Sequence, residues 1–92
     1  MEQVLILVKL DLGISGAKRD DYLLHFISAA KSELESKGIN LNLDDAADAM
    51  LLSDYVSWNY RHRTENLPLA KNIALRINNR VVKERGAGND RY

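Results

Sequence analysis

The sequence has 92 residues, which is enough for one small domain. Hydrophobic residues make up 46% and charged residues 28%, a balance typical of a soluble globular protein rather than of a disordered chain. The 13 basic and 13 acidic side chains cancel, so no global electric field draws the chain to nucleic acid or to an anionic membrane. The lack of cysteine excludes disulfides, thiolate zinc sites and cysteine nucleophiles.

The first segment, residues 2–12, is compatible with a strand and with a helix. Its aliphatic run favours a strand, but Val4, Val8 and Leu12 also share one helical face. Because no second strand is present to pair with it, we expect a helix. The run is too short for a membrane span and lacks the features of a secretion signal, so we expect the chain to stay in the cytosol where it is made.

Residues 20–37 have the clearest helical pattern. Asp20 is the expected N-cap. Gly38 is the expected left-handed residue after the helix, with Ile39 folding back on Leu34. Steps of three and four residues predict a buried face of Leu23, Ile27, Ala30 and Leu34.

The third helix is predicted to begin after Asp44, as its N-cap, and to run to about Arg63. Apolar residues surround most of its circumference, which predicts the central helix of the domain. The main stripe consists of Ala47, Leu51, Tyr55, Trp58 and His62, with Met50, Leu52 and Val56 on its flanks.

Pro68 suits the first turn of a fourth helix, and Gly86 suits its end after Arg85. The predicted buried face is Leu69, Ile73, Ile77 and Val81, and Leu75 and Val82 add a second row to it. We therefore expect an all-α fold, a small bundle of about four helices. Residues 1–86 would form its single domain and residues 87–92 a flexible C-terminal tail.

No pattern of catalytic residues is present. His25 and His62 are far apart and lack the spacing of a metal-binding helix. Asp44, Asp45 and Asp48 lack the spacing of a calcium loop, so helix capping explains them better. The sequence has no nucleophile elbow and no phosphate-binding loop. We therefore expect no enzyme activity, no cofactor and no metal.

Gly13-Ile-Ser-Gly16 has the spacing of the loop with which KH domains hold a nucleic-acid backbone. The flanking strands of a KH fold are missing. A simple turn between two helices is the better interpretation.

Charge is unevenly distributed along the chain. Residues 1–46 carry five basic and eight acidic side chains, a net of −3, and residues 47–92 carry eight basic and five acidic ones, a net of +3. Helix polarity explains part of this difference. The alternative is a dipolar molecule whose copies associate head to tail.

Aromatic residues and arginines alternate at the end of the third segment. Tyr55, Trp58, Tyr60, Arg61 and Arg63 allow three interpretations. In the first, the aromatic residues belong to the core and the arginines complement the helix C-terminus. In the second, the group is a protein–protein hot spot. In the third, the group binds nucleic acid. We rank them in that order.

A basic strip runs along the fourth segment, where Arg76, Arg80 and Lys83 follow at steps of four and three residues. It lies away from the buried row, so we expect it to be solvated or free for an acidic partner. Asn78 and Asn79 add hydrogen-bonding groups beside it. The candidate protein-interface residues are therefore Arg61, Arg63, Arg76, Asn78, Asn79, Arg80 and Lys83.

Several short patterns follow one another over about residues 9–85. The first half has Lys9-Leu-Asp-Leu-Gly-Ile14, Asp20-Asp-Tyr-Leu-Leu24, Ile27-Ser-Ala-Ala30 and Gly38-Ile39. The second half has Tyr55-Val-Ser-Trp58-Asn-Tyr60-Arg-His-Arg63, Leu67-Pro68 and Ile77-Asn-Asn-Arg80. In this order the patterns resemble the head–tail connector (head completion, adaptor) proteins of long-tailed phages and prophages.

The resemblance implies a structural virion or assembly protein without catalysis. Such subunits form a ring, usually dodecameric, between the portal of a filled capsid and the tail. The implied partners are other copies of the chain, the portal protein and a tail-side connector or stopper protein. DNA would pass through the ring without sequence-specific binding. The implied location is the virion, and the host bacterial cytoplasm during assembly. The alternative is a small helical nucleic-acid-binding or regulatory module that uses the basic C-terminal half.

Overall fold

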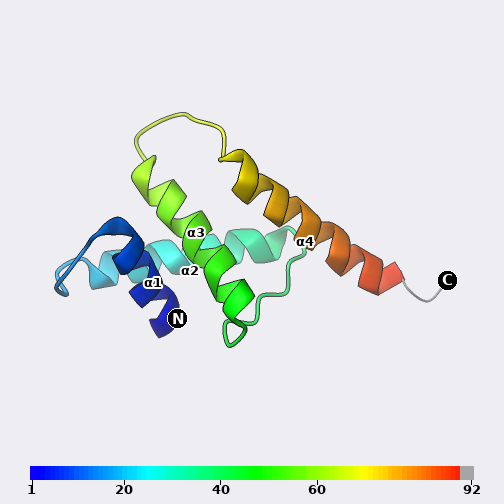
Figure 1. Ribbon diagram of the computed structural model, residues 1–92, viewed down its shortest axis with the longest axis horizontal. Coiled ribbons are helices and arrows are strands. Elements are labelled where there is room, and N and C mark those ends of the chain that lie inside the picture. Colours follow the sequence, from blue (N-terminus) through cyan, green and yellow to red (C-terminus); the bar gives the residue numbers. More distant parts are fainter. Residues whose placement is uncertain (90–92) are drawn as a thin grey trace.

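The computed structural model describes residues 1–89, and these fold into four α-helices with no strand among them (Figure 1). The helices are α1 (Glu2–Leu12), α2 (Asp20–Ser36), α3 (Ala46–Arg61) and α4 (Lys71–Asn89). The expected all-α bundle of four helices is confirmed.

The ambiguous first segment is a helix. It buries Val4 and Val8 completely, which satisfies the aliphatic run by packing instead of by strand pairing. Gly13 ends α1 in the left-handed conformation, with φ of 70°, and the amide of Ile14 donates to the carbonyl of Lys9 over 2.9 Å. Residues 13–16 thus begin the turn between α1 and α2, as expected.

The start of α2 differs from the prediction by one residue. Its N-cap is Arg19, and no side chain caps it. Asp20 is the first helical residue, and its carboxylate accepts a hydrogen bond from Lys9 Nζ over 2.8 Å. The cation on α1 therefore holds the side chain that was expected to cap α2.

The end of α2 follows the prediction. Gly38 has φ of 97°, and its amide donates to the carbonyl of Glu35 over 3.0 Å. The amide of Ile39 donates to the carbonyl of Leu34 over 3.4 Å, which completes the expected helix-ending motif. Both apolar side chains are buried, so this turn also adds to the core.

Helix α3 is central, because it packs against each of the other three helices. Its N-cap is Asp45 instead of Asp44, and the Asp45 carboxylate accepts the amide of Ala47 over 3.1 Å. The helix ends at Arg61 with His62 as its C-cap. The predicted stripe is buried at Leu51 and Tyr55, half-buried at Trp58 and His62, and exposed at Ala47.

Helix α4 begins at Lys71, three residues after Pro68. Leu69 and Ala70 stay outside the helix and pack against the core from the connecting segment. At its other end α4 continues past Gly86 and Gly88 to Asn89, since each glycine costs a helix only about 1 kcal/mol. Residues 87–89 of the expected tail are therefore helical, and residues 90–92 lie outside the described residues.

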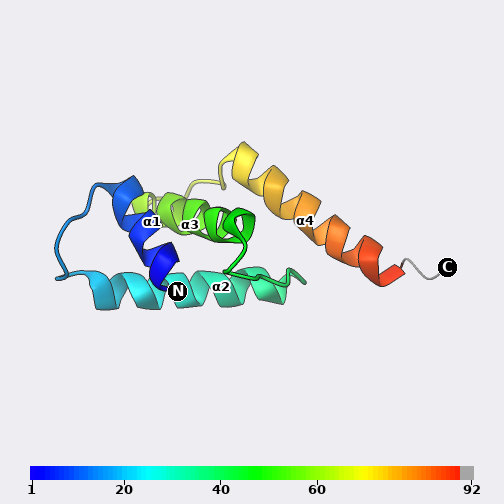
Figure 2. The ribbon, with the colours of Figure 1, turned by 60° about the horizontal axis from the view of Figure 1, so that its bottom comes forward.

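The molecule is elongated, with extents of 51 × 30 × 18 Å. Helices α1, α2 and α3 form one body, and α4 crosses its edge and extends away from it, as Figure 2 shows. The first half of α4 buries Ile73 and Ile77. The second half of α4 lies at the far end of the molecule from α1 (Figures 1 and 2).

Candidate protein interface around the fourth helix

Arg80 occupies the junction between α4 and the start of α3. Its guanidinium donates to both carboxylate oxygens of Asp48, with Nη2 and Oδ2 3.1 Å apart. It also donates to the carbonyl of Asn40 over 2.9 Å and to Glu84 over 3.3 Å. The expectation that Arg80 is free for a partner is wrong, because the chain itself supplies the acceptors.

Asp48 is the buried partner of this junction, with 2% of the residue exposed. Its carboxylate also accepts the amide of Asn42 over 2.8 Å. The hydrogen bond from Arg80 holds the pKa of Asp48 below its ordinary value, against the opposing effect of burial. The same contact raises the pKa of Arg80. The pair is therefore charged on both sides and ties α4 to α3.

The apolar stripe predicted for the third helix did not include Asp48, although the sequence contains a signal that this residue is buried. Asp48 precedes Leu52 and Val56 at steps of four, and both of these residues are fully buried. An acidic residue in register with a buried row needs a cation. Arg80, in the fourth segment, is that cation.

The other members of the basic strip differ from Arg80. Arg76 donates to Asp54 over 2.8 Å, and both side chains stay partly exposed. Lys83, Asn78 and Asn79 are exposed, and none of them forms a hydrogen bond or ion pair through its side chain within residues 1–89. Within residues 1–89, Lys83 is therefore the cation of the strip without a partner, and Asn78 and Asn79 are exposed amides beside it. Beside it lies a groove of about 370 Å³ between α3 and α4, lined by Ala47, Asp48, Met50, Leu51, Arg76, Asn79, Arg80 and Lys83.

Arg61 is the last residue of α3 and Arg63 follows its C-cap, at the opposite end of the helix from Asp48. Arg61 forms an ion pair with Asp11 at 3.2 Å and donates to the Asp11 carbonyl over 2.7 Å. The guanidinium carbon of Arg63 lies 3.9 Å from the centroid of the Tyr60 ring. The structure thus separates the predicted interface residues into two groups.

Tyr60 belongs to an aromatic cluster, and it is the only member of this cluster that the sequence analysis grouped with the arginines. Its ring contacts those of Tyr22 and Phe26 edge to face, at centroid distances of 6.0 and 5.8 Å. Arg19 donates to the Tyr60 hydroxyl over 3.3 Å. This cluster joins α2 to α3, so its main role is packing.

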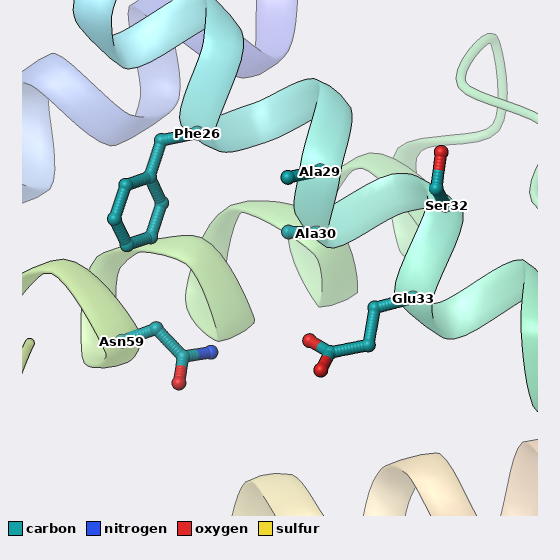
Figure 3. A pocket seen from close by; sticks show the side chains of 6 residues that line it. All are labelled: Phe26, Ala29, Ala30, Ser32, Glu33 and Asn59. Carbon is teal, nitrogen blue, oxygen red and sulfur yellow. The ribbon is translucent and has the colours of Figure 1, made fainter.

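A groove of about 520 Å³ lies between α2 and α3 (Figure 3). Its lining residues are Phe26, Ala29, Ala30, Ser32, Glu33 and Asn59. In Figure 3 the Glu33 carboxylate and the Asn59 amide point from opposite walls toward the space between them. The Tyr55 hydroxyl donates to Glu33, and burial together with this acceptor raises the pKa of Tyr55. The groove has an apolar floor with one carboxylate.

The outer side of α4 carries Leu75 and Val82, and the prediction that they form a second buried row is wrong. Leu75 and Val82 are each more than half exposed and lie two turns apart on the side away from Ile73 and Ile77. Lys71 and Arg85 flank them and are also exposed. Leu75 lies two residues from both Ile73 and Ile77, which is about 200° around the helix, and this offset was the available signal.

Residues 1–89 contain no cluster of three or more side chains suited to a metal ion. Within the same residues, no helix is long and apolar enough to cross a membrane. Comparisons with protein-family models, with curated proteins and with solved structures gave no match.

Proposed function

We propose that this chain is a structural subunit that assembles into a ring, as a head–tail connector of a long-tailed phage or prophage. The order of short patterns from Lys9 to Arg80 supports this proposal through its resemblance to that family. The four-helix architecture is compatible with it. In this role the ring contacts the portal on one side and a tail-side connector or stopper protein on the other, and DNA passes through it.

The observation that carries the proposal is the position of α4. This helix extends from the body (Figures 1 and 2). Its outer side leaves Leu75 and Val82 exposed beside Lys71 and Arg85. Uncovered apolar residues on a projecting helix are typical of surfaces that bind another protein. A catalytic role would need converging reactive groups, and α4 carries amides, aliphatic residues and cations on this side.

A nucleic-acid-binding module is the competing function, and the arginines argue against it. Arg61, Arg76 and Arg80 are engaged with Asp11, Asp54 and Asp48. A guanidinium bound to a carboxylate of its own chain must break that contact before it can bind a phosphate. These three cations therefore give weak support to a phosphate-binding surface.

The test is co-expression of the chain with the portal protein encoded by the same phage or prophage genome, followed by native mass spectrometry. We expect a series of complexes that ends in a closed ring on the portal. Complete absence of bound copies, with both proteins folded, would refute the connector role. DNA binding with a steep salt dependence would support the nucleic-acid-binding module instead.

A further inference from the structure

Two helices carry apolar side chains that no other described part of the chain covers. On α1, Ile6 and Leu10 lie one turn apart and are 57% and 75% exposed. On α4, Leu75 and Val82 lie two turns apart and are 60% and 66% exposed. Each pair therefore shares one side of its helix.

Both helices already use their inner sides. Val4 and Val8 of α1 are fully buried, and Ile73 and Ile77 of α4 are buried against the body. The exposed pairs point the other way, so they cannot join this core. Covering them requires another molecule, and the transfer of their surface from water is favourable.

The charges beside the α4 pair are positive. Lys71 precedes Leu75 by four residues, and Arg85 follows Val82 by three, so both lie on the same side of the helix. Neither forms an ion pair within residues 1–89. We call Lys71, Leu75, Val82 and Arg85 the α4 face.

The charges beside the α1 pair are negative. Glu2 precedes Ile6 by four residues, on the same side. The side-chain amide of Gln3 donates to the carbonyl of Leu43, which brings the exposed Asp44 close to the start of α1. Neither Glu2 nor Asp44 forms an ion pair within residues 1–89. We call Glu2, Ile6, Leu10 and Asp44 the α1 face.

We propose that the α1 face of one copy packs antiparallel on the α4 face of the next copy. This orientation sets Glu2 and Asp44 against Arg85, and Ile6 near Val82. It also opposes the positive N-terminal end of α1 to the negative C-terminal end of α4. The inference rests on the proposed ring-forming function and names the two surfaces through which the copies meet.

The two faces belong to different helices, α1 and α4, which lie apart in the molecule (Figures 1 and 2). The contact joins two different surfaces and is therefore heterologous. A chain of heterologous contacts forms a ring if the rotation closes and a filament if it does not. One helix face on another buries less than the roughly 1,600 Å² of a standard stable interface. A single contact is therefore weak, and closure of a ring, in which every copy uses both faces, stabilises the assembly.

Disulfide trapping tests the pairing, because the chain has no cysteine of its own. We would mix Ile6→Cys with Val82→Cys under assembly conditions on the portal and oxidise briefly. A disulfide forms only if the two Cα atoms come within about 7 Å. We expect a covalent heterodimer from the mixture, and a ladder of higher oligomers from the variant that carries both cysteines. Ile6→Cys mixed with Leu67→Cys, which is exposed but outside both faces, is the matched control.

Three results would overturn the inference. Rings that form without the heterodimer would show that the copies meet elsewhere and would leave the proposed function intact. Efficient disulfides from Ile6→Cys alone or Val82→Cys alone would indicate a symmetric contact. Absence of any association, with or without the portal, would overturn both the inference and the proposed function.

Charge reversal gives an independent readout. Arg85→Glu should weaken association by about tenfold or more, because it sets like charges against Glu2 and Asp44. Adding Glu2→Lys and Asp44→Lys to that variant should restore assembly. Failure of this rescue, with all variants showing the parent circular-dichroism spectrum, would contradict the proposed orientation.

Discussion

The guanidinium of Arg80 holds the buried carboxylate of Asp48, which lies 32 residues earlier in the chain. The Asp48 side chain is 3% exposed and that of Arg80 is 22% exposed, so the pair is largely shielded from water. This contact joins the predicted interface helix to the central helix. The position of α4 therefore depends on this pair as well as on the burial of Ile73 and Ile77.

Removal of the Arg80 guanidinium should destabilise the folded chain. Arg80→Ala should lower the free energy of unfolding by about 3 to 5 kcal/mol, because it leaves the Asp48 carboxylate buried without its partner. Asp48→Leu combined with Arg80→Leu should regain most of that loss. Urea unfolding measures both. Arg76→Ala is the control, since the exposed pair of Arg76 with Asp54 contributes only about 0 to 1 kcal/mol. Equal costs for the two single variants would show that Asp48 is solvated.

The same pair predicts a dependence of stability on pH. The pKa of Asp48 is lowered in the folded chain, chiefly by the hydrogen bond from Arg80. The resulting stability is present in full above the unfolded-state pKa of about 3.9 and is lost as the pH falls through the lower folded-state pKa. The free energy of unfolding should therefore fall from about pH 4 downwards, less steeply in Asp48→Asn than in the parent. Identical slopes in urea titrations would rule out this coupling.

Tyr55 should remain protonated when an ordinary tyrosine ionises. Burial, with the hydrogen bond to Glu33, raises the pKa of Tyr55 in the folded chain. The folded state thus keeps a proton that the unfolded state loses above about pH 10, so stability should decline as the pH rises past that value. Ultraviolet titration should show a late-ionising tyrosine that is missing in Tyr55→Phe. Simultaneous ionisation of all tyrosines in the folded parent would contradict this assignment.

The exposed and the buried leucines should respond differently to truncation. Leu52 is fully buried on the central helix, so Leu52→Ala should cost about 2 to 5 kcal/mol. Leu75→Ser, on the α4 face, should change the free energy of unfolding by no more than about 0.5 kcal/mol. Thermal and urea unfolding provide the comparison. A large loss at Leu75 would mean that the α4 face is part of the folded core.

The sequence predicted those features correctly that depend only on residues close together in the chain. Gly38 and Ile39 ended α2 as predicted, because the helix-ending motif depends only on residues within one turn. The start of α3 shows the limit of such signals. Asp44 and Asp45 have the same capping chemistry, and the Asn42 side chain, which accepts the amide of Asp44 over 3.1 Å, is part of the turn that leaves Asp45 at the cap.

Features that depend on distant contacts were not predicted. Nothing near Arg80 in sequence shows that Asp48 and Asn40 lie beside it, so the strip was expected to be free. The start of α4 at Lys71 likewise depends on the packing of Leu69 and Ala70 against the core. Of the candidate interface, the sequence identified the helix and its polar residues, but it placed Leu75 and Val82 in a second buried row, whereas both are exposed.

The central position of α3 has a consequence for local unfolding. Helices α1, α2 and α3 contact one another, whereas α4 makes its main helix–helix contact with α3 alone. Segments with few buried contacts open at lower free energy than the core, often as one cooperative unit. The amides of α4 should therefore exchange with deuterium before those of α3, while the other three helices stay closed. Helix α4, which carries the exposed Leu75 and Val82, should thus also be the first helix to unfold locally.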